Sequence, residues 1–211
     1  MFDHWLRSLK DRWFAPLAQR LGPRITPNLL TLLAFSAGIA CAIALANGMN
    51  RAALALWIGN RLLDGLDGTQ ARVHGLSSAF GGYLDIILDF VIYAAVPLAM
   101  IVAGHDRPLD LAGATLLASF FVNAASWMYL SAVLEQRAAG ARSTGELTTV
   151  TMPPGIIAGA ETVVLYASFI IWPSWRVAGF LVMAGLVGVN VIQRLVWAWR
   201  RLDHNGPTPP G

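Results

Sequence analysis

The sequence predicts an all-α integral membrane protein with six transmembrane helices and an N-terminal amphipathic helix at the membrane interface. Hydrophobic residues make up 56% of the 211 residues and charged residues only 13%, whereas soluble domains are about a quarter charged. The mean hydropathy is +0.56. The apolar residues fall into six stretches, each close to the length of about twenty residues that a helix needs to cross the hydrocarbon core.

Residues 1–25 are predicted to form the interfacial helix. Large apolar side chains recur in residues 2–21 at intervals near the helical repeat, and charged residues lie between them. This pattern is typical of a helix that lies on a membrane surface. The stretch lacks the uninterrupted apolar core and the cleavage site of a signal peptide, so we expect it to stay in the mature protein. The alternative is a helix that packs on the membrane domain itself.

Residues 26–201 are predicted to form one six-helix membrane domain. Short polar turns join most of the helices, and the connection from Glu135 to Pro154 is the longest and most polar. Residues 202–211, rich in Pro and Gly, are predicted to form a disordered tail. The six predicted spans cover residues 27–47, 52–72, 79–103, 110–134, 154–172 and 175–199.

Basic residues predict the orientation, because cytoplasmic loops carry an excess of Lys and Arg. Only Arg51, Arg107 and Arg176 fall on the side opposite the majority. Both termini are therefore expected in the cytoplasm, and we expect the plasma or inner membrane of a bacterium. Because these residues flank apolar stretches, we expect no nucleic-acid partner despite the net charge of +3. The majority comprises Arg7, Lys10, Arg12, Arg20, Arg24, Arg72, Arg137, Arg142, Arg194, Arg200 and Arg201.

Five acidic residues lie inside predicted spans, where an ionised side chain costs about 2.5–3.5 kcal/mol even on lenient insertion scales. Such residues usually line a water-filled cavity, bind a cation or relay protons. The five are Asp64, Asp67, Asp85, Asp89 and Glu161.

Four of these acids are predicted to converge on one point. Asp64 and Asp67 share a helix face at i and i+3, and Asp85 and Asp89 share one at i and i+4. The two helices are consecutive and antiparallel, so all four carboxylates fall in the cytoplasmic half of the bilayer. Oxygen ligands favour magnesium, manganese or calcium over zinc, and the single cysteine, Cys41, excludes a cysteine-rich metal site. A pair of divalent cations would balance the charge.

Other polar and aromatic residues in the spans are interpreted as structural. Arg61 precedes Asp64 by one turn and is interpreted as a neutralising partner for an acid. Trp57 is expected in the aromatic belt at the membrane surface. Interhelical hydrogen bonds are expected for Asn60, Asn123 and Ser126.

The acids belong to a longer pattern, Asp64-x2-Asp67-Gly68-x2-Ala71-Arg72-x8-Gly81-x3-Asp85-x3-Asp89. This pattern resembles the signature of the CDP-alcohol phosphotransferase (phosphatidyltransferase) family, with eight specified positions over twenty-six residues. Thr26-Pro27-Asn28 at the start of the first span also resembles a frequent family feature.

The resemblance implies an enzyme that transfers a substituted phosphate from a CDP-linked donor to an alcohol and releases CMP. Asp64, Asp67, Asp85 and Asp89 would bind two divalent cations, Mg²⁺ or Mn²⁺, and Asp89 would also be the catalytic base that takes the proton of the acceptor hydroxyl. The CDP moiety would be surrounded by Gly68, Ala71, Arg72 and Gly81, with Arg72 on a phosphate. An arginine at a helix end is also an ordinary topology anchor. A homodimer is a further implication of the resemblance.

The expected donor is a CDP-linked lipid, CDP-diacylglycerol, whose acyl chains stay among the membrane lipids while a small alcohol enters from the cytoplasm. Family members use glycerol 3-phosphate, serine or inositol phosphate as acceptor, and the sequence does not decide among them. Glu161 and Arg194 are acceptor-binding candidates. Glu161 has the alternative of an interhelical hydrogen bond, and Arg194 that of extending to the membrane surface.

Two other functions compete with this interpretation. An ion-coupled transporter or channel also uses intramembrane carboxylates, but it predicts acids distributed across the bilayer and internal repeats. The sequence instead gathers its acids at one depth and shows no repeat. A catalytically inactive member of the same family is the second alternative, and the presence of all four aspartates argues against it.

Overall fold

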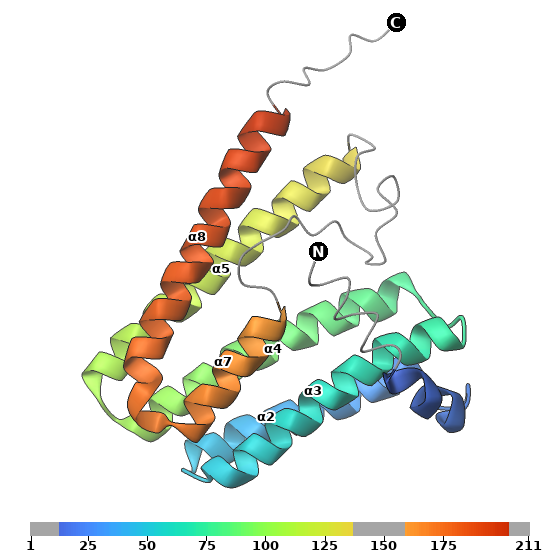
Figure 1. The fold of residues 1–211 in the computed structure, drawn as a ribbon, viewed down its shortest axis with the longest axis horizontal. Coiled ribbons are helices and arrows are strands. Elements are labelled where there is room, and N and C mark those ends of the chain that lie inside the picture. The colour runs from blue at the N-terminus through green and yellow to red at the C-terminus, as the bar shows by residue number, and fades with distance from the viewer. Residues whose placement is uncertain (1–12, 137–158, 203–211) are drawn as a thin grey trace, which may run out of the picture. The chain divides into compact units, whose positions relative to one another are not determined.

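The computed structural model describes residues 13–136 and 159–202, and within these ranges its regular structure is helical, without strands. The first described helix covers residues 13–21. The further elements, labelled in Figure 1, are α2 (Pro27–Ala46), α3 (Asn50–Val73), α4 (Ala79–Gly104), α5 (Arg107–Gln136), α7 (Gly159–Ile171), the 3-10 turn η1 (Pro173–Trp175) and α8 (Arg176–Leu202). Three predicted parts lie outside the described ranges. They are residues 1–12 of the interfacial helix, most of the connection from Glu135 to Pro154, and the tail after residue 202.

Four stretches are helical, long and apolar enough to cross a membrane, and they coincide with four of the six predicted spans. These are Pro27–Ala46, Ala79–Gly104, Arg107–Gln136 and Pro173–Leu202. The all-helical, multi-pass character of the protein is thereby confirmed. Helix α3, with 24 residues, covers the second predicted span but carries charged side chains along its length. Helix α7 has 13 described residues, so the count of six spans stays a prediction.

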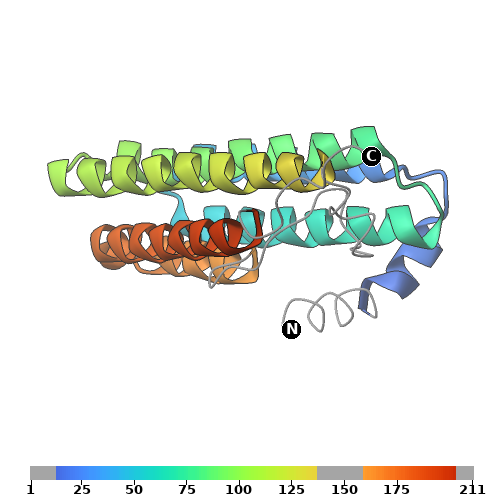
Figure 2. The same ribbon diagram turned by 90° about the horizontal axis from the view of Figure 1, so that it is seen from above.

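The described residues form two compact units. The first unit contains the chain up to Asp110 and the segment Val163–Arg176. In it α2, α3 and α4 run alongside one another, as Figures 1 and 2 show. The second unit contains the described residues within Leu111–Thr162 and those from Val177 to Leu202, and its helices α5 and α8 run side by side.

The ends of the helices in the first unit follow from local sequence. Thr26 is the N-cap of α2, accepting a hydrogen bond from the Leu29 amide, and Pro27 occupies the first helical position. Ser78 caps α4 in the same way and accepts from the Gly81 amide. The short turn between α3 and α4 contains Gly75 at φ 65°, a conformation that glycine adopts without strain. As a result, the end of α3 and the start of α4 are neighbours, which the acidic residues on both helices require.

The helix over residues 13–21 packs on the first unit. Ala18 is fully buried and forms a small apolar cluster with Leu30 of α2 and Leu66 of α3. Trp13, at 77% exposed, and Leu17, at 44%, lie on its open face. The structure thus favours the alternative of a helix packed on the domain, while contact of its open face with the membrane stays a prediction.

Candidate active site and metal centre

Three carboxylates from two neighbouring helices come together in the first unit. Asp64 of α3 and Asp85 and Asp89 of α4 each offer one oxygen, and these oxygens lie within 4.8 Å of one another. All three side chains are partly buried. Oxygen donors in this number fit a hard divalent cation such as Mg²⁺ or Mn²⁺. The residues present therefore fit the metal site that the sequence predicted at this point.

Asp67, the fourth predicted ligand, does not belong to this group of three. Asp67 is only 5% exposed, and its Oδ2 accepts a hydrogen bond of 2.7 Å from the Thr31 hydroxyl of α2. Sequence reasoning did not find Thr31, because a threonine inside an apolar helix carries no signal of its partner. Its proximity to an acid depends on how α2 packs against α3.

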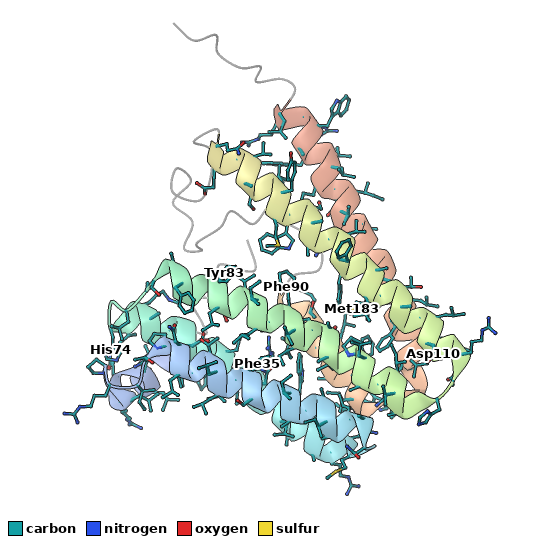
Figure 3. All side chains as sticks on the ribbon, turned by 180° about the vertical axis from the view of Figure 1, so that it is seen from behind. Phe35, His74, Tyr83, Phe90, Asp110 and Met183 are labelled. Carbon is teal, nitrogen blue, oxygen red and sulfur yellow. The ribbon has the colours of Figure 1, made fainter. Side chains whose placement is uncertain are left out.

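A pocket lies next to the three acids and is enclosed by α2, α3 and α4. Figure 3 shows the side chains from behind and labels Phe35, which contributes to the pocket from α2. The lining combines apolar side chains with the three acids. Its residues are Thr31, Ala34, Phe35, Asn60, Asp64, Asp85, Leu88, Asp89 and Ile92.

Arg61 supplies a positive charge to the acids. Its Nη2 lies 2.8 Å from Asp89 Oδ1, and its Nη1 lies 3.8 Å from Asp64 Oδ2. The interpretation of Arg61 as a neutralising partner agrees with these contacts, but the partners include Asp89 on the next helix as well as Asp64 on its own. Asn60 accepts a hydrogen bond from Arg61 Nε and donates to the Ala34 carbonyl of α2, so its expected interhelical role is confirmed.

Trp57 is not in an aromatic belt at the membrane surface, and that expectation was wrong. The side chain is buried, with 1% exposed, and its ring lies 4.9 Å from the Arg61 guanidinium carbon. Tyr93 accepts a hydrogen bond from Arg61 Nη1 at 3.0 Å. The reason for the error is that a tryptophan near a span end has the same sequence signature whether it faces lipid or an interior cation.

The four residues predicted to surround CDP lie close to the acids in the sequence, and two of them are glycines. At Gly81, an added Cβ would lie 3.0 Å from both Asn28 Oδ1 and Ser78 Oγ, so the start of α4 approaches the start of α2 closely. At Gly68, a Cβ would lie 3.3 Å from Arg72 Nη1. Arg72 is exposed at the end of α3, and Ala71 is partly buried beside it. Side-chain atoms of Asn28, Ser78 and Arg72 therefore lie directly beside these two glycines.

The two acceptor candidates belong to the second unit and not to the group of three acids. Glu161 is exposed in the first turn of α7. Arg194 is 6% exposed, and its Nη1 donates to Asn123 Oδ1 at 3.1 Å and to Ser126 Oγ at 3.3 Å. The alternative that Arg194 extends to the membrane surface was therefore wrong, because polar partners on α5 bind the guanidinium and keep it buried. The expected interhelical hydrogen bonds of Asn123 and Ser126 are confirmed, with Arg194 as their partner.

Comparison with known proteins decides the family. The family model described as CDP-alcohol phosphatidyltransferase matches residues 24–192, most of the chain. The chain belongs to this family. The resemblance carried by the pattern from Asp64 to Asp89 is thereby confirmed.

Relatives of this chain include proteins named for inositol phosphate lipids. The inner membrane protein YnjF of Escherichia coli K12 is 37% identical over 83% of this chain and 84% of its own length. The archaetidylinositol phosphate synthase of Methanothermobacter thermautotrophicus is 28% identical over 93% of each chain. An inner membrane relative agrees with the multi-pass helical structure found here.

Solved structures of the phosphatidylinositol phosphate synthase of Mycobacterium tuberculosis have the same fold. The form with CDP-DAG bound superposes with a TM-score of 0.69 at 26% identity, covering 89% of this chain and 94% of that one. The form with manganese and citrate gives a TM-score of 0.68 at 26% identity, covering 88% of each chain. A manganese complex of a related protein, together with the three acids of this chain, supports the use of a divalent metal.

Proposed function

We propose that this phosphatidyltransferase moves a phosphatidyl, or similar substituted phosphate, group from CDP-diacylglycerol to the hydroxyl of a small alcohol and releases CMP. The observation that carries the proposal is the meeting of Asp64, Asp85 and Asp89 within 4.8 Å in a chain of this family. The donor is inferred from the CDP-DAG complex of the mycobacterial relative.

Two divalent cations, Mg²⁺ or Mn²⁺, would be held by Asp64, Asp67, Asp85 and Asp89. When bound, they supply positive charge that stabilises the pyrophosphate and favours ionisation of the acceptor hydroxyl. Asp67 would act from a carboxylate that the Thr31 hydroxyl already orients. The manganese complex of the mycobacterial relative supports this choice of metal class.

Asp89 would be the catalytic base. It lines the pocket, its side chain is 30% exposed, and Arg61 Nη2 donates to its Oδ1 at 2.8 Å. The second oxygen can then take the proton of the acceptor hydroxyl. The acceptor oxygen forms a bond to the phosphorus of the transferred group, and the bond from that phosphorus to the CMP oxygen breaks.

Gly68, Ala71, Arg72 and Gly81 would surround the CDP moiety. The two glycines have no side chain of their own to keep the nucleotide from the backbone of α3 and α4, and the Arg72 side chain that lies beside Gly68 would turn toward the nucleotide. The guanidinium of Arg72 is exposed at the end of α3, where it can bind a phosphate through two parallel hydrogen bonds.

The topology proposed for the whole chain has three parts. Residues 1–25 form an interfacial helix, residues 26–201 a six-span membrane domain and residues 202–211 a tail, with both termini and the active site facing the cytoplasm. Helix α3 would cross the membrane despite its charges, because Arg61 offsets part of the negative charge of Asp64 and Asp89 inside the bundle. We also propose that two copies form a homodimer, as the family resemblance implies.

Inositol phosphate is the acceptor to test first. The relatives from Methanothermobacter thermautotrophicus and Mycobacterium tuberculosis are both named for inositol phosphate lipids. Glycerol 3-phosphate and serine are the other acceptors. Arg194, a buried positive charge, stays a candidate for an acceptor phosphate, and Glu161, an exposed carboxylate, a candidate for hydroxyls or an amine.

The test is CMP release by the purified protein in detergent, with CDP-diacylglycerol, Mg²⁺ or Mn²⁺ and one alcohol at a time. We expect metal-dependent CMP with one alcohol and its loss in Asp89→Asn. The matched control is Asp110→Asn, which changes an exposed acid in the first turn of α5 and should keep activity. Absence of metal-dependent CMP with every alcohol and with other CDP-linked donors would contradict the proposal and favour an inactive family member.

A further inference from the structure

The Arg61 guanidinium has polar partners on two sides. On one side, Nη2 lies 2.8 Å from Asp89 Oδ1 and Nη1 lies 3.8 Å from Asp64 Oδ2. On the other side, Nε donates to Asn60 Oδ1 at 2.5 Å and Nη1 donates to Tyr93 Oη at 3.0 Å. The Arg61 side chain is 10% exposed. A positive charge in this position is fixed in place next to two acids of the metal group.

Aromatic side chains from three helices build the surroundings of this guanidinium. Trp57 of α3 lies 4.9 Å from its central carbon, measured to the ring centroid. Tyr166 of α7 packs on Trp57 at 5.4 Å and on Tyr93 of α4 at 5.8 Å between ring centroids. Tyr166 Oη also donates to the Tyr93 carbonyl at 2.7 Å. Trp57 and Tyr166 are buried, with at most 1% exposed. This assembly prevents the guanidinium from turning away from the acids.

The contact between Arg61 and Asp89 selects one carboxylate oxygen. Because Oδ1 accepts from Nη2, a charge-assisted hydrogen bond restrains the carboxylate. The same fixed charge repels a divalent cation that approaches Asp64, Asp85 and Asp89, since like charges at these distances interact strongly in an interior of low dielectric.

We propose that Arg61 is a positioning residue with two effects, one on orientation and one on metal affinity. It orients Asp89 for proton transfer, and it acts as a built-in counter-ion that weakens the binding of the divalent cations. The first effect rests on the proposed function, because it concerns turnover. The second effect concerns only the binding of the metal and is testable without any substrate.

Two substitutions separate these effects. Arg61→Gln removes the charge and the fork of donors, whereas Arg61→Lys keeps the charge but cannot bind Asn60, Tyr93 and Asp89 together. The control is Arg176→Gln, which removes another buried arginine whose partners are the Phe169 carbonyl and Asn50. If only the structural loss of a buried arginine mattered, Arg61→Gln and Arg176→Gln would change metal binding alike.

The experiment measures Mn²⁺ affinity by electron paramagnetic resonance and CMP release by the same detergent-solubilised variants. Arg61→Gln is expected to bind Mn²⁺ about three- to tenfold more tightly, because repulsion from the guanidinium is lost. Its kcat should fall about 10- to 100-fold, as for other residues that orient a metal ligand. Arg61→Lys should keep the wild-type Mn²⁺ affinity and still lose kcat, and Arg176→Gln should keep both.

Unchanged or weaker Mn²⁺ binding by Arg61→Gln would overturn the counter-ion effect, and full kcat in Arg61→Lys would overturn the orienting effect. If Arg61→Gln does not fold, Tyr93→Phe removes one partner of Nη1 while leaving the arginine, and lower kcat with wild-type Mn²⁺ affinity is expected. Absence of CMP release by the wild type would contradict the proposed function alone, because the Mn²⁺ affinities still test the counter-ion effect.

Discussion

The Thr31 hydroxyl donates a hydrogen bond of 2.7 Å to Asp67 Oδ2 and so connects α2 with α3 beside the candidate metal centre. Both residues are buried, with 6% and 5% exposed. A carboxylate in such surroundings requires a donor, because an unpaired buried charge is costly. The contact therefore has a structural effect on helix packing and, in the proposed function, a chemical effect on the orientation of a metal ligand.

Thr31→Val tests this double role. Valine has nearly the same shape as threonine, so the packing stays while the hydroxyl is lost. We expect the thermal unfolding midpoint in detergent to fall, corresponding to a loss of about 1–3 kcal/mol for the hydrogen bond that the Thr31 hydroxyl gives to the buried Asp67 carboxylate. CMP release should fall about 10- to 100-fold, as expected when a partner of a metal ligand is removed. Thr31→Ser keeps the donor and should restore most activity; equal losses in both variants would contradict the role of the hydroxyl.

Gln70 holds the segment that joins the helix of residues 13–21 to α2. The side chain is fully buried, and its Nε2 donates to the carbonyls of Gly22 and Ile25 at 2.8 Å each. Gln70→Leu leaves both carbonyls without this donor, and we expect stability to fall by about 1–3 kcal/mol. Thermal unfolding in detergent checks this change. The matched control is Gln136→Leu at the exposed end of α5, and an equal shift in both variants would argue against the tether.

Gly81→Ala tests the close approach at the start of α4. The added Cβ would lie 3.0 Å from Asn28 Oδ1 and Ser78 Oγ, so both polar groups must shift by a few tenths of an ångström. Because these groups adjoin the proposed CDP site, we expect a higher KM for the CDP-linked donor. Gly59→Ala on α3 is the control, since no atom lies within 4 Å of its added Cβ. Steady-state kinetics of CMP release compares the two, and an unchanged KM in Gly81→Ala would exclude a steric role at this position.

The convergence of acids on α3 and α4 was predictable, because it depends on helix periodicity and on a short connection between antiparallel helices. Asp64, Asp85 and Asp89 satisfy this geometry in the structure. The partner of Asp67 was not predictable, because the position of Thr31 depends on the packing of a third helix. The interior position of Trp57 was missed for the same reason, since lipid-facing and buried tryptophans have the same sequence pattern.

Arg194 shows a related limit of sequence reasoning. An arginine near a helix end can extend to the membrane surface, and no local feature of the sequence excludes that arrangement. In the structure it is buried against Asn123 and Ser126, residues about seventy positions earlier in the chain. Asn123 and Ser126 were both expected to form interhelical hydrogen bonds. Their shared partner, Arg194, was not predictable, because it depends on how α5 and α8 pack side by side.

The central claim is that the three acids form a divalent cation centre for transfer from a CDP-linked lipid. Its most direct test is to remove metal from the purified protein with EDTA and to titrate Mn²⁺ back while CMP release is followed, with inositol phosphate as the first acceptor. We predict no CMP without metal, saturable recovery with Mn²⁺ in the wild type and no recovery in Asp85→Asn. CMP release without a divalent cation, or at the wild-type rate in Asp85→Asn, would contradict the account.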